Sequence, residues 1–94
     1  MKKLLIAAIF ALPMLAHAHG DVFEMTEMSV SEALRKFQTE ETTSTIQAYR
    51  GVRAWPSGAE IKVRVYYGAQ DSFLYSCEMD HATGAEEKIV CQKN

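Results

Sequence analysis

Residues 77–91 read CEMDHATGAEEKIVC, with a cysteine at each end and turn-forming residues in the middle. If Cys77 faces Cys91 in an antiparallel hairpin, the centre of the hairpin falls within those turn-forming residues. The same register sets Met79 opposite Ile89, two apolar residues on the cysteine face. Cysteine spacing, turn and apolar pattern therefore agree on a terminal hairpin bridged by Cys77–Cys91.

These two cysteines are the only ones in the chain. They stand fourteen positions apart, which is not the C-x-x-C spacing of a thiol oxidoreductase. Closing a loop of this size with a disulfide contributes about 3 kcal/mol of stability in the chain-entropy account. A small domain needs this contribution, because its hydrophobic core alone gives marginal stability. We therefore expect a structural disulfide and an oxidising compartment.

Upstream of the hairpin, residues 59–67 alternate between apolar and polar side chains, which indicates a half-buried strand. Its inner face would carry Ile61, Val63, Val65 and Tyr67, and its outer face Glu60, Lys62, Arg64 and Tyr66. Residues 68–71 (GAQD) are typical of a turn. The inner face of the strand after that turn would carry Phe73, Tyr75, Cys77 and Met79.

Residues 45–55 also follow a period of two, which predicts a first strand ahead of the other three. Its inner face would carry Ile46, Ala48, Val52 and Ala54. Gly51 beside Arg50 indicates a β-bulge that turns the arginine side chain aside. Pro56-Ser57-Gly58 then predicts a turn into the next strand, although the pairing register across this turn is left open.

One helix is expected before the strands. Ser29 and Glu32 form a capping box, in which a hydroxyl and a carboxylate satisfy backbone donors at a helix start. An apolar stripe at i, i+3, i+4 and i+7 follows, made of Val30, Ala33, Leu34 and Phe37. The polar residues that come next predict a helix end within residues 38–41. Residues 22–25 are interpreted as a brief strand or as a segment tucked onto the domain.

The predicted fold class is therefore α+β. One N-terminal amphipathic helix would pack on the apolar face of a four-stranded antiparallel meander, which one disulfide closes. Residues 19–94 are long enough for this single small domain and no more.

Residues 1–18 have the organisation of a secretory signal peptide. Lys2 and Lys3 give a charged start, residues 4–15 are apolar, and Ala16-His17-Ala18 is the small-x-small pattern that signal peptidase reads. The apolar run is shorter than the roughly 20 residues of a membrane span. We therefore expect cleavage after Ala18, no membrane span, and a periplasmic or secreted protein.

The balance of charge and the absence of motifs narrow the function. The chain carries twelve acidic and ten basic residues, and its formal charge is −2. Loss of Lys2 and Lys3 with the signal would make the mature protein more acidic, which argues against non-specific nucleic-acid binding. The sequence has no nucleophile motif and no glycine-rich phosphate loop. We therefore predict a non-enzymatic protein with no nucleic-acid partner.

The outer face of the first two strands is one candidate site. Aromatic and basic residues are expected there on alternate positions: Tyr49, Arg53, Trp55, Lys62, Arg64 and Tyr66. Aromatic residues and arginine are the composition that protein interfaces favour. The alternative is an ordinary solvent face stabilised by cross-strand pairs. As a binding surface, this face would hold an acidic patch on a partner.

The other candidate is a copper site at the mature N-terminus. After cleavage behind Ala18, the α-amine and imidazole of His19 could together chelate copper(II), with His81 as a further ligand. A cut after Ala16 would instead expose His17-Ala18-His19, a sequence that also binds copper(II) or nickel(II). The alternative is a histidine that follows the cleavage site by chance, and a second one in an exposed turn. No cofactor other than copper is expected.

A short N-terminal strand, one helix, four antiparallel strands and a disulfide across the last hairpin form an order of elements similar to the cystatin arrangement. Residues 47–51 (QAYRG) also resemble the Q-x-V-x-G inhibitory loop of that family, with Tyr49 where valine is expected. The shared positions are Gln47 and Gly51, and both fall inside a predicted strand. The resemblance covers the order of elements and assigns no specific family.

The sequence therefore predicts a small exported binding module that recognises another macromolecule, in the manner of an inhibitor or immunity protein. A protein is the expected partner. The alternative function is copper binding or copper delivery through His19. Whether the protein acts as a monomer or a homodimer is left open.

Overall fold

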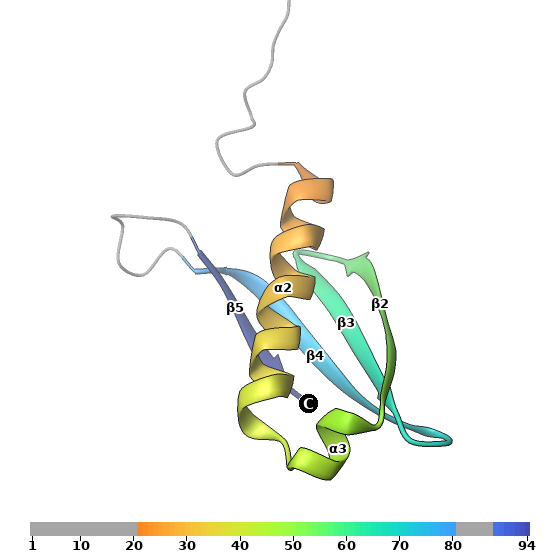
Figure 1. Ribbon diagram of the computed structural model, residues 1–94. Helices are drawn as coiled ribbons and strands as arrows, with labels where there is room; N and C mark the ends of the chain where they lie inside the picture. The colour runs from red at the N-terminus through yellow and green to blue at the C-terminus, as the bar shows by residue number, and fades with distance from the viewer. Residues whose placement is uncertain (1–20, 81–87) are drawn as a thin grey trace, which may run out of the picture.

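The computed structural model describes residues 21–80 and 88–94. Its elements, in chain order, are helix α2 (Val22–Glu40), the short helix α3 (Thr43–Gln47), and strands β2 (Tyr49–Ser57), β3 (Glu60–Tyr67), β4 (Asp71–Asp80) and β5 (Lys88–Lys93). The strands form one antiparallel sheet in the order β2-β3-β4-β5, and α2 lies across one of its faces (Figure 1). The predicted α+β fold, a helix on a four-stranded meander, is therefore confirmed.

Helix α2 begins eight residues before the predicted start. Asp21 is its N-cap, and the Asp21 carboxylate accepts a hydrogen bond of 2.8 Å from the backbone N–H of Glu24. The capping box predicted at Ser29 and Glu32 is wrong, because Ser29 is buried inside the helix and Glu32 accepts hydrogen bonds from Arg35 instead. Aspartate caps as well as serine, so the earlier cap begins a longer helix. The predicted helix end is confirmed at Glu40.

Small residues on α2 allow the helix to lie close to the disulfide. The buried residues of α2 are Ser29, Ala33 and Phe37, spaced four apart on the face toward the sheet. The Sγ atoms of Cys91 and Cys77 lie 3.7 and 3.9 Å from the backbone oxygen of Ser29. The buried hydrophobic core consists of Ala33, Phe37, Ile61, Val63, Val65, Tyr75, Cys77, Ile89 and Cys91.

Residues 43–47 form a helical turn that includes residues 45–47, where the sequence predicts the beginning of a strand. Thr42 caps α3, and its hydroxyl oxygen accepts a hydrogen bond of 3.2 Å from the backbone N–H of Thr45. Because the Thr42 hydroxyl satisfies a backbone donor of the helical turn, this local bond competes with strand pairing. Threonine is a good helix cap as well as a good strand residue. Ile46 packs against the core, and the first strand begins only at Tyr49.

The two tight turns of the meander contain glycines with positive φ. Ser57 pairs with Glu60, so the first turn is Gly58-Ala59, and Pro56 lies within the edge strand β2. Gly58 has φ +63°, a conformation that side chains disfavour. Gly68 has φ +64° in the turn after β3, and its N–H donates a 2.9 Å hydrogen bond to the carbonyl of Ala48. The pairing register that the sequence left open therefore sets Ser57 opposite Glu60, and the turn begins two residues beyond its predicted start at Pro56.

The terminal hairpin has the predicted register. Cys77 pairs with Cys91 and Met79 with Ile89, and the disulfide joins the two cysteines. Both half-cystines are buried. The predicted hairpin centre falls in residues 81–87, outside the described residues.

The disulfide should therefore account for a large part of the stability. Replacing both cysteines, Cys77→Ala with Cys91→Ala, should lower the free energy of unfolding by about 3 kcal/mol, because the unfolded chain regains the freedom of the closed loop. Urea denaturation of the purified protein measures this change. Wild-type protein under a reducing agent should show the same loss, and an unchanged denaturation midpoint in both samples would contradict the prediction.

Tyr75 is a buried polar residue on the inner face of β4. Its side chain has 0% exposure, and within the described part of the chain its hydroxyl has no hydrogen-bond partner. Burial raises the pKa of Tyr75 from 10.0 to about 12, and the nearby carboxylates of Glu41 and Glu40 add to this shift. The folded protein therefore keeps this proton at a pH at which the unfolded chain has lost it.

The raised pKa predicts a loss of stability in alkali. Because the folded pKa of about 12 exceeds the unfolded value of 10.0, the contribution of Tyr75 is complete below pH 10 and is lost between pH 10 and 12. Tyr75→Phe should leave neutral-pH stability unchanged or raise it by about 1 kcal/mol, because an unpaired buried hydroxyl is removed. It should also flatten the alkaline decline in urea midpoints, whereas Tyr49→Phe, at an exposed position, should not. A decline of equal steepness in Tyr75→Phe would contradict the prediction.

Candidate functional site

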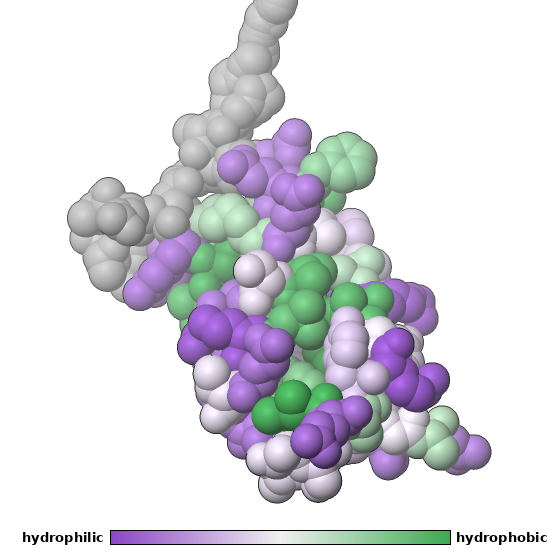
Figure 2. Space-filling view, viewed as in Figure 1, coloured by the Kyte–Doolittle hydropathy of each residue, from purple (hydrophilic) through white to green (hydrophobic). Residues whose placement is uncertain are grey.

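The face of the sheet opposite α2 carries five of the six residues expected on it. Arg53 and Trp55 lie on β2, directly opposite Arg64 and Lys62 of β3, and Tyr66 pairs with Gly51. Figure 2 shows the other side of the molecule, where α2 covers the sheet and many hydrophilic side chains face the solvent. In the described part of the chain, no helix lies against the face that carries the five residues. We call these five residues, together with Arg50, the outer-face cluster.

Tyr49 lies on the opposite side of the sheet from the position expected for it. The pairing register shifts between Tyr49 and Gly51, which confirms the β-bulge predicted at Gly51. The extra residue reverses the alternation, so Tyr49 pairs with Tyr67 and its ring lies 6.1 Å from that of Phe37 on α2. Tyr49 therefore contacts the helix, although it is 43% exposed.

Arg50 is the member of the outer-face cluster that strict alternation missed. It is the extra residue of the bulge, and its guanidinium carbon lies 5.9 Å from the centre of the Tyr66 ring. In the sequence, the feature that indicated a changed direction for Arg50 was Gly51, because a glycine in a strand often marks a bulge, and a bulge redirects neighbouring side chains. The cluster thus gains an arginine where a tyrosine was expected.

Neighbouring side chains hold the cluster in place. The guanidinium carbon of Arg53 lies 4.8 Å from the centre of the Trp55 ring, within cation–π range. Arg64 donates a hydrogen bond of 2.9 Å to the hydroxyl of Ser72 on β4. Lys62 donates one of 2.7 Å to Ser76 and forms an ion pair of 3.1 Å with Glu60. These contacts restrict the rotamers of the cationic side chains.

The charges of the outer-face cluster are only partly neutralised. Lys62 has Glu60 as its partner, but Arg50, Arg53 and Arg64 pair with no carboxylate among the described residues. Arg53 also stands directly opposite Arg64 on the neighbouring strand. Like charges directly opposite each other in a sheet are destabilising. An acidic chain therefore keeps a local excess of positive charge on this face.

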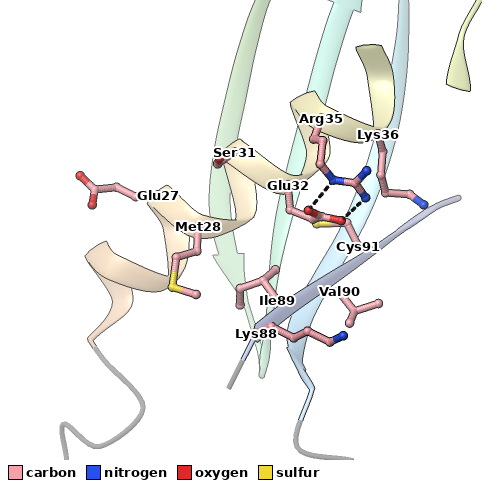
Figure 3. A pocket seen from close by; sticks show the side chains of 10 residues that line it. All are labelled: Glu27, Met28, Ser31, Glu32, Arg35, Lys36, Lys88, Ile89, Val90 and Cys91. Carbon is pink, nitrogen blue, oxygen red and sulfur yellow. Dashed lines mark hydrogen bonds and ion pairs between the residues drawn. The ribbon is translucent and has the colours of Figure 1, made fainter. Parts of the chain in front are cut away.

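A second surface feature is a groove between α2 and the edge strand β5 (Figure 3). Its volume is about 780 Å³, and it is lined by Glu27, Met28, Ser31, Glu32, Arg35, Lys36, Lys88, Ile89, Val90 and Cys91. Arg35 donates hydrogen bonds of 2.9 and 2.7 Å to the two carboxylate oxygens of Glu32. These bonds are the main reason that the pKa of Glu32 lies below its ordinary value. Sequence periodicity did not point to this groove, which forms only when the helix and the last strand meet.

The residues of the expected copper site, His19 and His81, lie outside the described residues. Within residues 21–80 and 88–94, no group of three or more histidine, cysteine or acidic side chains is arranged to hold a metal ion. Both cysteines of the chain are joined in the disulfide. In the same part of the chain, no helix combines the length and the hydropathy needed to cross a membrane.

Comparison with models of known protein families, with curated protein sequences and with solved structures found no match to this chain. The segment that resembles the cystatin inhibitory loop does not project as a loop. Gln47 ends α3, and Gly51 belongs to the bulge of β2, which is paired within the sheet. The expected short N-terminal strand is also absent from residues 21–40, because Val22–Glu40 is helical.

Proposed function

We propose that the protein is a small, exported, non-enzymatic binding module whose outer-face cluster recognises an acidic patch on a protein partner. An inhibitor or immunity-type role fits this proposal. The observation that carries it is the pair Arg53 and Arg64, two arginines paired across β2 and β3 that have no carboxylate partner among the described residues.

The arginine pair is better matched to a bound carboxylate than to the isolated fold. Two like charges on neighbouring strands weaken the sheet, and no described acidic residue offsets them. An aspartate or glutamate of a partner docked on this face would accept charge-assisted hydrogen bonds from the free N–H groups of either guanidinium. Binding would then relieve the repulsion between the arginines, and this relief would add to the affinity for the partner.

The aromatic members of the cluster supply the apolar part of such an interface. Trp55 and Tyr66 are residue types that dominate binding energy at protein interfaces, as is arginine. Each already contacts an arginine, Trp55 with Arg53 and Tyr66 with Arg50. Since these contacts hold the side chains in place, less conformational entropy is lost when a partner binds.

The overall acidity of the chain favours a partner with a local acidic patch over a long polyanion. The whole sequence has a formal charge of −2, although the outer-face cluster is basic. A long polyanion would also meet the acidic remainder of the surface, whereas a small acidic patch need only meet the cluster. Opposite charges on partner and cluster would speed and orient their encounter.

Export is supported by the leader-like residues 1–18 and by the buried disulfide. Disulfides persist in oxidising compartments and are rare in the cytosol. The Cys77–Cys91 bridge joins adjacent strands in the core beneath α2, so we assign it a structural role.

The proposal predicts that the outer-face cluster can be disabled without unfolding the protein. Arg53→Ala, Arg64→Ala and Tyr66→Ala together should weaken partner binding at least tenfold, about 1.4 kcal/mol or more, because the charged and aromatic contacts are lost together. The partner would be isolated on immobilised wild-type protein from extracts of the native exported compartment. Its affinity would then be measured by calorimetry at low and high salt.

A triple variant on the helix side provides the matched control. Phe23→Ala, Gln38→Ala and Thr39→Ala remove one aromatic and two neutral side chains from α2, which lies on the opposite face, and leave the groove beside β5 intact. This control should bind as the wild type does, and both triple variants should keep the wild-type melting temperature to within a few degrees. Unchanged affinity in the outer-face variant would refute the proposal. Loss of its fold would show that the three residues are structural.

A further inference from the structure

The two edges of the sheet differ in how well they can pair with another strand. Edge strand β2 contains the bulge at Arg50–Gly51 and carries Pro56, which has no backbone N–H. Both features hinder the addition of a further strand. Edge strand β5 pairs with β4 without a register shift from Lys88 to Lys93 and contains no proline. Among residues 21–80 and 88–94, the fold therefore protects one edge of the sheet and leaves the other open.

The backbone of β5 offers a regular set of free hydrogen-bonding groups. The Cα atoms of Cys77 and Cys91 are only 4.0 Å apart, as in the closely spaced, non-hydrogen-bonded pairs of an antiparallel ladder. The N–H and C=O groups of Ile89, Cys91 and Lys93 therefore point away from β4, toward the free edge. The bond of 2.8 Å from the N–H of Asn94 to the carbonyl of Leu74 fits this alternation.

Lys93, near the C-terminal end of β5, does not obstruct the edge. The Nζ atom of Lys93 forms an ion pair with Glu41 and lies 4.1 Å from the centre of the Phe73 ring. This side chain is therefore drawn over the helix-covered face of the sheet. Between the two lysines of β5, Ile89 is buried and Val90 is half-buried, and both line the groove beside α2.

We propose that this edge and groove bind a second copy of the chain, with β5 pairing antiparallel to β5 of the partner subunit about a two-fold axis at Val90. Ile89 would then lie opposite Cys91 of the partner subunit, and Lys88 opposite Gln92 of the partner subunit. Val90 would meet its own counterpart in a closely spaced pair. No like charges lie opposite each other in this register.

The helix wall of the groove has matching self-complementary charges. Glu27, Ser31 and Arg35 are spaced four apart on α2, and all three line the groove. A two-fold axis runs the two helices in opposite directions, so Glu27 faces Arg35 of the partner subunit while Ser31 faces its counterpart. The small side chain of Ser31 at the centre leaves room for the two α2 helices to approach each other closely. The groove is therefore self-complementary in charge, which a two-fold symmetric interface requires.

The dimer would have one eight-stranded sheet. A two-fold axis perpendicular to the sheet places both α2 helices on one side and both outer-face clusters on the other. The inference goes beyond the proposed function and does not rest on it, because the β5 edge and the outer-face cluster are separate surfaces.

A charged side chain introduced at position 90 tests the proposed interface. Val90→Lys places two lysines opposite each other across the axis, but within one chain the new lysine faces Glu78, so the fold should be retained. In sedimentation equilibrium of the full, naturally processed chain, the wild type should be a dimer. Val90→Lys should raise the dimer dissociation constant at least tenfold, with the circular-dichroism spectrum of the wild type retained. Val90→Thr, which keeps a branched and uncharged side chain, should remain dimeric.

Cysteine cross-linking tests the register. Val90→Cys should form an intermolecular disulfide on mild oxidation, because closely spaced pairs in antiparallel strands suit this bond, as Cys77 and Cys91 do. Glu78→Cys is the matched control, since it also lies on the outer face beside a native half-cystine, but one strand farther in. It should remain uncross-linked under the same conditions.

Several results would overturn the proposal. A wild-type protein that stays monomeric up to submillimolar concentration would do so, as would a dimer that Val90→Lys leaves intact. A different protein found seated on β5 of the exported material would also overturn it. Because the outer-face variants keep β5 intact, failure of the dimer and failure of partner binding can be told apart.

Discussion

The contact between the Cys77–Cys91 disulfide and the backbone of α2 is the constraint on which the rest of the structure depends. The sulfur atoms lie against the carbonyl of Ser29, and only small residues at positions 29 and 33 allow the helix to come so near. The bridge fixes the register of the last two strands, and the helix seated on it covers one face of the sheet. In the described part of the chain, no helix covers the opposite face, which is left to the solvent or to a partner.

The bulge at Gly51 links this architecture to the candidate site. A shift of one residue in a strand moves every side chain beyond it to the other face. Here it brings Tyr49 against Phe37 of the helix and leaves Arg50 beside Tyr66 in the outer-face cluster. The same irregularity also interrupts the β2 edge. One local feature thus shapes the core, the candidate binding face and the protected edge.

Sequence patterns predicted the sheet well because apolar and polar side chains alternate along the strands, so several residues indicate the same inner face. Alternation along β3 and the cysteine spacing gave the faces and the terminal register independently. The start of the helix was harder to predict, because Asp21 and Ser29 are equally good caps and only packing decides between them. The threonine run at residues 42–45 was misjudged for a similar reason, since a hydroxyl cap outweighed strand propensity. The groove was not predictable, because it depends on how α2 and β5 meet in three dimensions.

The two proposed surfaces reinforce each other physically. A cluster of a few arginines and two aromatic side chains covers little area, and an interface of that size is typically weak. An axis perpendicular to the sheet would set two such clusters on one continuous face. A partner with two acidic patches would then bind the second cluster at a high effective concentration, which raises avidity without any new contact. The unprotected edge of β5 would thus convert a weak recognition face into a stronger bivalent one.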